Sequence, residues 1–189
     1  MPSDLEIVNG ALTRLGQPPI SVIGEATRAG ALAAAEYERI RDGLLRSHPW
    51  NFATTTAQLT AHLPTPVGWL KAWELPLDQL RVLSIVDIGG PETEVWSIED
   101  GVLVEKVAFS SVVIRYIRRV LEPGRFSHGF VDALIATLAQ EWVEPLTSSA
   151  SLSQRIDVAQ DRALQVARSA EGQEGSVKVI QHSSWIQRR

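Results

Sequence analysis

The chain has 189 residues, of which 44% are apolar and 21% charged, values typical of a globular protein with one full hydrophobic core and far from the disordered class. It has no cysteine, which excludes disulfides, thiolate metal sites and cysteine nucleophiles. The net charge is −4; the last 18 residues carry +2, so residues 1 to 171 carry −6, which argues against a protein whose main task is to bind phosphates.

No apolar run reaches the about 18 residues needed to span a bilayer. The first residues, "MPSDLEIVNG", lack the basic and then apolar pattern of a signal peptide. We therefore expect a protein that is soluble and intracellular when made, with no membrane partner.

A first helix is predicted from the start of the chain to about residue 15. Ser3 and Glu6 have the spacing of a capping box, and Gly16 and Pro18-Pro19 end the pattern. The apolar stripe between these signals has helical spacing and consists of Leu5, Val8, Leu12 and Leu15.

A second helix is predicted from about Thr27 to Ser47. Pro49 disfavours helical geometry at His48 and therefore ends it. Its apolar face is formed by Ala33, Tyr37, Ile40 and Leu44.

Residues 51 to 120 are rich in β-branched and aromatic types and predict short antiparallel strands. In "EVWSIEDGVLVE", two alternating runs flank Asp100-Gly101, which predicts a hairpin with a turn of positive φ. The stretch "SSVVIRYIRRV" also alternates, and we expect one face to pack and the other to meet solvent or a partner.

Two more helices are predicted after "EPGRF". The first runs from about Ser127 to Leu146, with Pro145 in its last turn and an apolar stripe of Phe130, Leu134, Leu138 and Trp142. The second runs from about Leu152 to Ala170, with an alanine-rich face of Leu152, Ile156, Ala159, Ala163 and Val166.

These elements predict an α+β fold that is mainly α. Residues 1–50 and 121–171 are expected to form a four-helix bundle, because two helical pairs at opposite ends of the chain pack most simply on each other. Residues 51–120 form an inserted small antiparallel β-sheet subdomain, and residues 172–189 form an extended C-terminal tail.

The sequence gives no signal of catalysis. The four histidines, His48, His62, His128 and His182, lie in no recognised catalytic or metal-binding context, and nucleophile-elbow, Walker and HExxH motifs are absent. Glu141 and Glu144 are neighbours on a helix, but a solvated helix face gives that pattern more often than an acid–base site. We expect no enzymatic activity, no cofactor and no metal site.

Six tryptophans fall into three groups. Trp50, Trp96 and Trp142 lie in periodic apolar segments and are expected in the core. Trp69 and Trp73, four residues apart, are expected either to pack on the sheet or to form a contact patch.

Trp185 has no periodic apolar partner and lies in the tail next to Ile186, Arg188 and Arg189. Tryptophan and arginine are enriched at interface hot spots, so we expect this segment to bind a partner.

A second basic cluster consists of Arg115, Arg118 and Arg119 in "IRYIRR". It could contact nucleic acid or form a salt-bridged contact between subunits. The acidic body favours the subunit contact.

Several stretches together resemble the tail tubular protein A family of tailed bacteriophages. They are "IVNGALTRLGQPPI", "LLRSHPWNFA", "ELPLDQLRVL", "VIRYIRR", "RFSHGFVDALIATLAQEWVEPLTSS" and the terminal "W…RR". The resemblance covers nearly the whole chain in the expected order, and "HPWNFA" followed by "LPLDQLRVL" is its most specific part. Members of this family are head-to-tail connector, or adaptor, proteins.

The resemblance implies a structural virion protein at the portal vertex, made in the host bacterial cytoplasm. Twelve copies would form a ring under the portal protein, extend the channel through which double-stranded DNA passes, and carry the next tail component, a stopper or nozzle protein. It implies that Trp185 and Ile186 anchor the tail on the portal while Arg188 and Arg189 pair with portal carboxylates. It also implies that Trp50 and Phe52 are structural, sealing the bundle against the sheet.

Two other readings stay open at this point. Short helices before a β segment can contain a helix-turn-helix, so a DNA-binding regulatory protein of phage origin is the main alternative. An enzyme of unknown class is the second. The compact β region and short tail leave the tail type open, and the ring could belong to a gene transfer agent.

Overall fold

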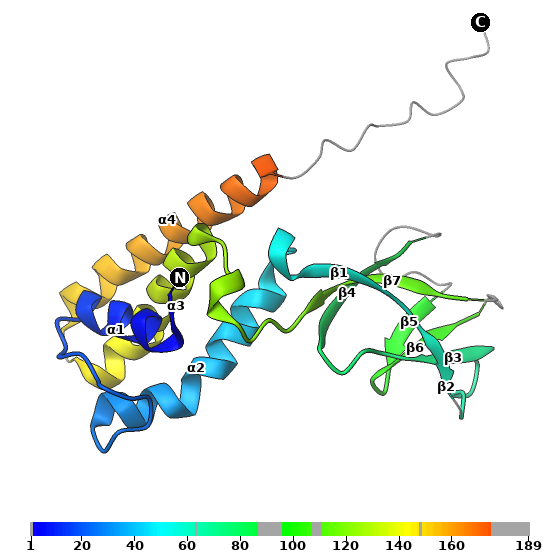
Figure 1. Ribbon diagram of the computed structural model, residues 1–189, viewed down its shortest axis with the longest axis horizontal. Coiled ribbons are helices and arrows are strands. Elements are labelled where there is room, and N and C mark those ends of the chain that lie inside the picture. Colours follow the sequence, from blue (N-terminus) through cyan, green and yellow to red (C-terminus); the bar gives the residue numbers. More distant parts are fainter. Residues whose placement is uncertain (1, 63, 87–95, 107–110, 148, 175–189) are drawn as a thin grey trace, which may run out of the picture.

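The computed structural model describes residues 2–62, 64–86, 96–106, 111–147 and 149–174. It has an α+β fold in which the helices form one end of an elongated molecule and the strands form the other (Figure 1). In chain order the elements are α1 (Asp4–Arg14), α2 (Arg28–Ser47), β1 (Thr54–Gln58), β2 (Thr60–His62), β3 (Lys71–Glu74), β4 (Gln79–Ile85), β5 (Trp96–Glu99), β6 (Val102–Glu105), β7 (Val113–Arg118), α3 (His128–Leu146) and α4 (Ala150–Glu174), with single 3₁₀ turns at Asn51–Ala53 and Pro123–Arg125.

The first two helices begin and end where the sequence predicts. Ser3 and Glu6 form a complete capping box at the start of α1. The Thr27 hydroxyl accepts the Gly30 N–H at the start of α2, and His48, just before Pro49, has extended backbone. The residues predicted on the α2 apolar face are all buried, as are Val8, Leu12 and Leu15 of the α1 stripe.

Helix α3 is the centre of the helical part. Its predicted stripe of Phe130, Leu134, Leu138 and Trp142 is fully buried, and α1, α2 and α4 each pack on it. Helices α1 and α2 have few contacts with each other. A regular four-helix bundle is therefore not confirmed by this packing.

Helix α4 differs from its prediction in length and in the face it buries. It runs from Ala150 to Glu174, so residues 172–174, predicted as tail, continue the helix. Ile156 is buried as predicted, but the prediction that Val166 and Ala159 face the core is wrong: both are exposed, and Ala167 and Glu171 are buried instead. Because small apolar residues occur all around α4, their spacing could not identify the buried face.

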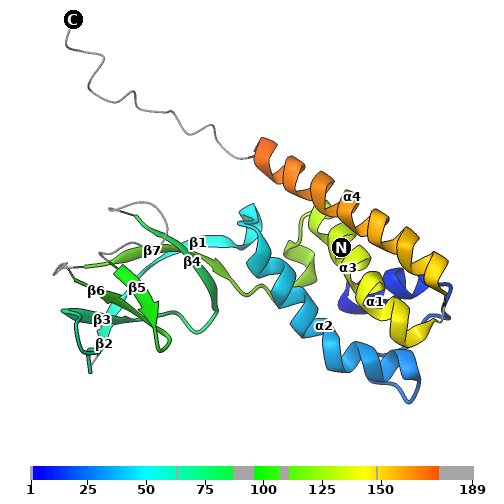
Figure 2. The same cartoon turned by 180° about the vertical axis from the view of Figure 1, so that it is seen from behind.

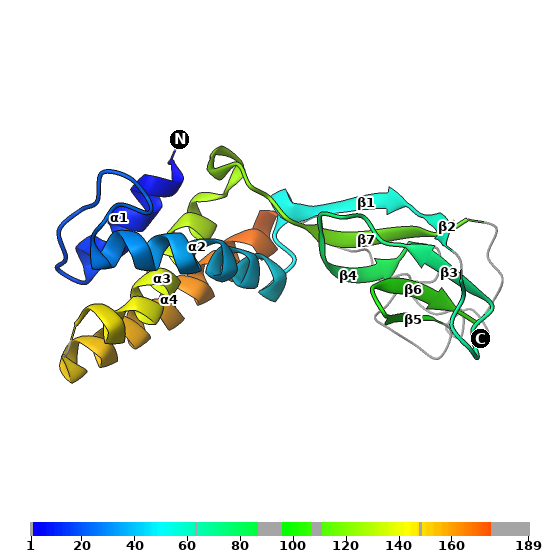
Figure 3. The ribbon, with the colours of Figure 1, turned by 90° about the horizontal axis from the view of Figure 1, so that it is seen from below.

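The strands are short and antiparallel, as the sequence predicts, but they form two sheets where one was expected. One has the order β1-β7-β4 and the other β2-β3-β6-β5 (Figure 3). Leu59 alone separates β1 from β2 and carries the chain from the first sheet to the second. Residues of both sheets bury a second hydrophobic core formed by Leu59, Trp73, Ile85, Trp96, Leu103, Val112, Ile114 and Tyr116.

The predicted hairpin is confirmed. β5 and β6 pair with Glu99 opposite Val102, and the two residues between them, Asp100 and Gly101, have φ of 49° and 75°. These values fit the type I′ turn that Asp-Gly favours.

Strand β7 connects the two hydrophobic cores. Ile114 and Tyr116 lie in the core between the sheets, as the predicted alternation requires. The expectation that the other face meets solvent or a partner fails at Ile117, which is fully buried in the helical core together with Val120. The chain therefore passes from one core to the other within four residues.

The two neighbouring tryptophans have different environments. Trp73 is buried between the sheets. Trp69 precedes β3, is half-buried, and donates from Nε1 to Oε2 of Glu99 at 3.0 Å, with Lys106 over its ring. Only Trp73 serves as a core residue.

Helix α4 leads into the segment predicted to bind a partner. Trp185, Ile186, Arg188 and Arg189 lie outside the described residues. Within the described part of the chain, each helix is too short or too polar to cross a membrane.

Replacing Trp50 tests the helical core. Trp50 is fully buried and its Nε1 donates to the Leu44 carbonyl at 3.0 Å. Trp50→Ala should lower the free energy of unfolding by about 3–5 kcal/mol, because it leaves a large cavity. The matched control Trp69→Ala should cost about 1 kcal/mol, since it mainly removes one hydrogen bond at the surface. Urea unfolding followed by far-ultraviolet circular dichroism measures both; equal losses would contradict the assignment.

Candidate functional site

The region where the helices meet the sheets contains several long-range polar contacts and one of the two predicted site clusters. Four links lie in it: an aromatic cluster, a shared carboxylate, a group of hydrogen bonds made by Asp78 and Arg81, and a contact between the start of β1 and the end of α4. Together they decide how rigidly the two parts are joined.

The aromatic cluster contains the residues of "HPWNFA". The Trp50 and Phe130 rings meet edge to face with centroids 5.1 Å apart, and Phe52 lies 5.1 Å from Phe130 and 5.7 Å from Phe126. Such pairs stabilise beyond the area that they bury. The first residues after α2 are thus fixed against the start of α3, in agreement with the structural role expected for Trp50 and Phe52.

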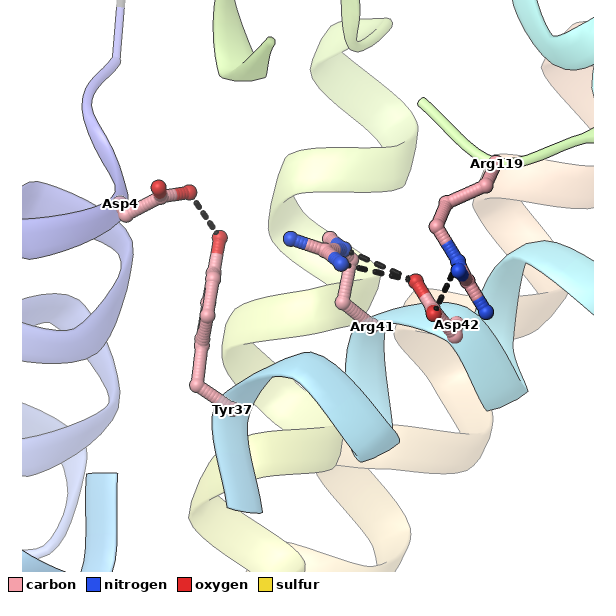
Figure 4. A network of polar contacts seen from close by, with 5 residues as sticks. All are labelled: Asp4, Tyr37, Arg41, Asp42 and Arg119. Atoms are coloured by element: carbon pink, nitrogen blue, oxygen red, sulfur yellow. Dashed lines mark hydrogen bonds and ion pairs between the residues drawn. The ribbon is translucent and has the colours of Figure 1, made fainter. Parts of the chain in front are cut away.

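Asp42 of α2 holds two arginines (Figure 4). Its Oδ1 accepts from Nε and Nη2 of Arg41, both at 3.0 Å, and its Oδ2 pairs with Nε of Arg119 at 2.7 Å. Arg41 is only 3% exposed, whereas the Arg119 side chain is 47% exposed. A buried guanidinium needs a paired carboxylate, so Asp42 both neutralises Arg41 and ties α2 to the end of β7.

A second buried polar pair lies on the same helix. The hydroxyl of Tyr37 donates to Oδ1 of Asp4, joining α2 to α1 (Figure 4). Burial and this hydrogen bond to a carboxylate raise the pKa of Tyr37 well above its usual value. Tyr37 therefore stays a neutral donor.

Asp78, in the turn before β4, strengthens the connection. Its carbonyl accepts the Arg119 N–H at 2.6 Å, and its carboxylate accepts from the Tyr116 hydroxyl at 3.1 Å. Burial, and then the hydrogen bond to Asp78, raise the pKa of Tyr116. Arg81 of β4 donates to the Arg46 carbonyl at 3.1 Å, close to the C-terminus of α2.

The last link joins Asn51 to the end of α4. The Asn51 N–H donates to Oε2 of Glu171 at 2.7 Å, and its side-chain amide donates to the Glu171 carbonyl at 3.1 Å. Glu171 is 5% exposed. The end of α4, from which residues 175–189 continue, is thereby held beside the start of β1.

The three predicted inter-subunit arginines do not form one continuous surface. Arg115 is exposed in the middle of β7, and Arg118, three residues along the strand, is on the opposite face. Arg119 is paired within the chain with Asp42. Their contact with a neighbouring subunit stays a prediction, and Arg115 is the one most available for it.

The histidines and carboxylates form no cluster for chemistry in the described residues. His48 is half-buried against Trp50, with ring centroids 4.9 Å apart, and His128 is exposed at the first residue of α3. The part of the chain that the structure describes contains no group of three His, Asp or Glu that could hold a metal ion. The side chain of His62 and all of His182 lie outside that part.

Asp42 and Glu171 were not predicted from the sequence. Glu171 is buried and Asp42 lies half-buried beside the buried Arg41, and charged groups in such places commonly need a partner. The consecutive Arg41-Asp42 pair at the edge of the α2 apolar face was a usable signal. Nothing local indicated that Arg119 and Asn51 would be the partners, since they lie 77 and 120 residues away in the chain.

Comparison with known proteins gave no assignment. No family model matches the chain, and no curated protein is significantly similar to it.

Removing the shared carboxylate should weaken the fold more than removing its exposed partner. Asp42→Ala leaves the Arg41 guanidinium buried without its ion pair and should cost about 3 kcal/mol of unfolding free energy. Arg119→Ala should cost about 1 kcal/mol or less, because the Arg119 side chain is half-exposed. The control Glu38→Ala removes an exposed acid of the same helix. Urea unfolding would contradict this account if Arg119→Ala were the more damaging change.

His48 should make stability fall with acid. Burial, then the charge of Arg168, lower the pKa of His48 below its ordinary value of 6.5, against the weaker opposing effect of Glu171. The unfolded chain therefore binds this proton more tightly, so the stabilisation by neutral His48 is present above pH 6.5 and is lost as the pH falls through the folded pKa. His48→Gln should lose less unfolding free energy than wild type between about pH 7.5 and about pH 5. Identical pH slopes for the two proteins would contradict this.

Proposed function

We propose that the protein is a structural virion protein, a head-to-tail adaptor of a tailed phage or a phage-derived particle. It forms a ring of twelve copies under the portal protein, extends the DNA channel and joins the capsid to the next tail component. In this proposal the helices form the ring body, as a four-helix bundle, and the β subdomain faces the tail or the neighbouring subunit.

The observation that supports this most is the division of the molecule into two differently built ends that are rigidly joined. The helical and β parts each have their own hydrophobic core, and β7 contributes to both. Asp42, Asp78 and Glu171 fix the joint with hydrogen bonds between distant segments. A subunit that connects two assemblies needs separate contact surfaces at a fixed distance, and this arrangement supplies them.

The position of the α4 end also supports the proposal. Because Glu171 is held by Asn51, residues 175–189 continue from a fixed point at the joint. In the proposed adaptor this segment binds the portal, with Trp185 and Ile186 in apolar pockets and Arg188 and Arg189 on carboxylates. A docking peptide that starts from a fixed point loses less conformational entropy when it binds its partner.

The charge distribution is compatible with passage of DNA. Residues 1 to 171 carry −6, so a ring of such bodies repels phosphates and lets the duplex slide. A DNA-binding regulator needs the opposite charge, and no described feature favours that alternative.

The direct test mixes the purified protein with portal rings from the same particle and images the products by electron microscopy. Full-length protein should add a ring of twelve subunits to each portal. A protein that adds no ring would contradict the adaptor function.

The role of the tail is tested in the same assay. Truncation before Gln181 and Trp185→Ala should both weaken portal binding, the single change by about tenfold or more, as expected of an interface hot spot. Ser183→Ala in the same segment is the matched control and should bind normally. Rings that form equally well without the tail would remove the docking role and leave the adaptor function standing.

A further inference from the structure

The helical part carries an open groove away from the joint with the sheets. It has a volume of about 680 Å³ and lies between the start of α3, one side of α4 and Arg14 at the end of α1. Its apolar lining comes from α4 and consists of Leu152, Ile156, Val158, Ala159, Ala163, Val166 and Ala167.

Two of these apolar side chains are largely exposed to solvent. Val158 is 71% exposed and Val166 60%. Val166 was predicted on the packed face of α4 and Val158 was not, and the helix packs on α3 through Ile156 and Ala167. The apolar residues of α4 thus exceed what contact with α3 covers, and the surplus forms one continuous strip along the groove.

The charges around the groove are mainly positive. Arg14, Arg155 and Arg162 line it against one acid, Asp132. Arg155 and Arg162 are seven residues apart and share one side of α4. None of the three arginines forms an ion pair with another residue in the described ranges. The groove therefore fits an occupant with an acidic surface.

Such a surface exists on the far side of the same body. Glu36 of α2 and Glu141 of α3 pair with a single base, Arg39, which lies 3.7 Å from Glu36 and 3.6 Å from Glu141. Glu144, three residues after Glu141, is exposed on the adjoining side of α3. This group has two more acids than bases. Helices α2 and α4 lie on opposite sides of α3 (Figures 1 and 2).

The position of these acids along α3 agrees with that view. Asp132 lines the groove and Glu141 belongs to the acidic group. They are nine residues apart in the helix, which places them half a turn from each other around its axis.

We propose that the arginine-lined groove of one subunit receives the acidic α2–α3 face of a second copy, in a head-to-tail contact. Complementary patches on opposite sides of one body give a heterologous contact, which closes into a ring when the rotation allows it. The chain's own tail is a poorer occupant, because Lys178, Arg188 and Arg189 meet the groove arginines with like charge. The contact between two copies does not depend on the adaptor function. Only the closure of such contacts into a ring around the portal rests on it.

Because the chain has no cysteine, single cysteines can report the contact directly. Val158→Cys in the groove and Glu144→Cys on the acidic face are made separately, mixed at high concentration and treated with a short bismaleimide linker. The expected product is the mixed 158–144 dimer, at least tenfold over either homodimer, and the double variant gives a ladder of oligomers. A predominant 158–158 dimer, or no crosslink, overturns the proposal.

Charge reversal provides the second readout. Arg155→Glu with Arg162→Glu should reduce the mixed crosslink at least tenfold, and adding Glu141→Arg on the acidic face should partly restore it. All three side chains are exposed, and an unchanged circular dichroism spectrum and melting temperature show that each variant is folded. A crosslink yield that is the same in wild type and in the charge-reversed variants overturns the proposal.

The same variants separate this contact from the proposed function. If wild type forms rings on portals and the reversed groove variant forms them equally well, the contact is wrong and the adaptor function stands. If the mixed crosslink forms and depends on charge while wild type adds no ring to a portal, the contact stands and the adaptor function fails.

Discussion

The arrangement of the whole molecule depends on the carboxylate of Asp42. It neutralises the buried Arg41 guanidinium in the helical part and binds Arg119 at the end of β7. A buried cation without this partner would be costly, so the position of α2 and the exit of β7 are set together. Around this ion pair, Asp78 and Glu171 add hydrogen bonds, and Ile117 and Val120 carry β7 into the helical core. The β subdomain is thus joined to the helices by packing and charge at once.

The proposed adaptor function needs a joint of this kind. Both parts have their own core, and loosely linked parts of that kind would move independently. Here the β7 strand, the aromatic cluster around Phe130 and the contact between Asn51 and α4 hold them at a fixed distance. The proposed adaptor function uses that rigidity, and the proposed contact between copies uses two faces of the helical part that the joint leaves free.

The sequence was sufficient wherever the signal was local. The capping box at Ser3, the start of α2 at about Thr27, the Asp100-Gly101 turn and the stripe from Phe130 to Trp142 were each predicted from residues close together in the chain, and all are confirmed. Prediction failed where the deciding partner was distant or the pattern was degenerate. The pairing of Arg119 with Asp42 was not foreseen because the two residues are far apart in the chain, and the buried face of α4 was only partly predicted because apolar residues occur on several sides of that helix.

In the proposed function this molecule is the repeating unit of a ring on a portal, and its helical and β parts form one rigid body. A cryo-electron microscopy reconstruction of full-length protein bound to portal rings tests it most directly. The account predicts twelve subunits, each fitted by the helical and β parts as one rigid body, with α4 of one copy against α2 and α3 of the next. Portals without added density, or subunits in which the two parts must be moved relative to each other to fit, would contradict it.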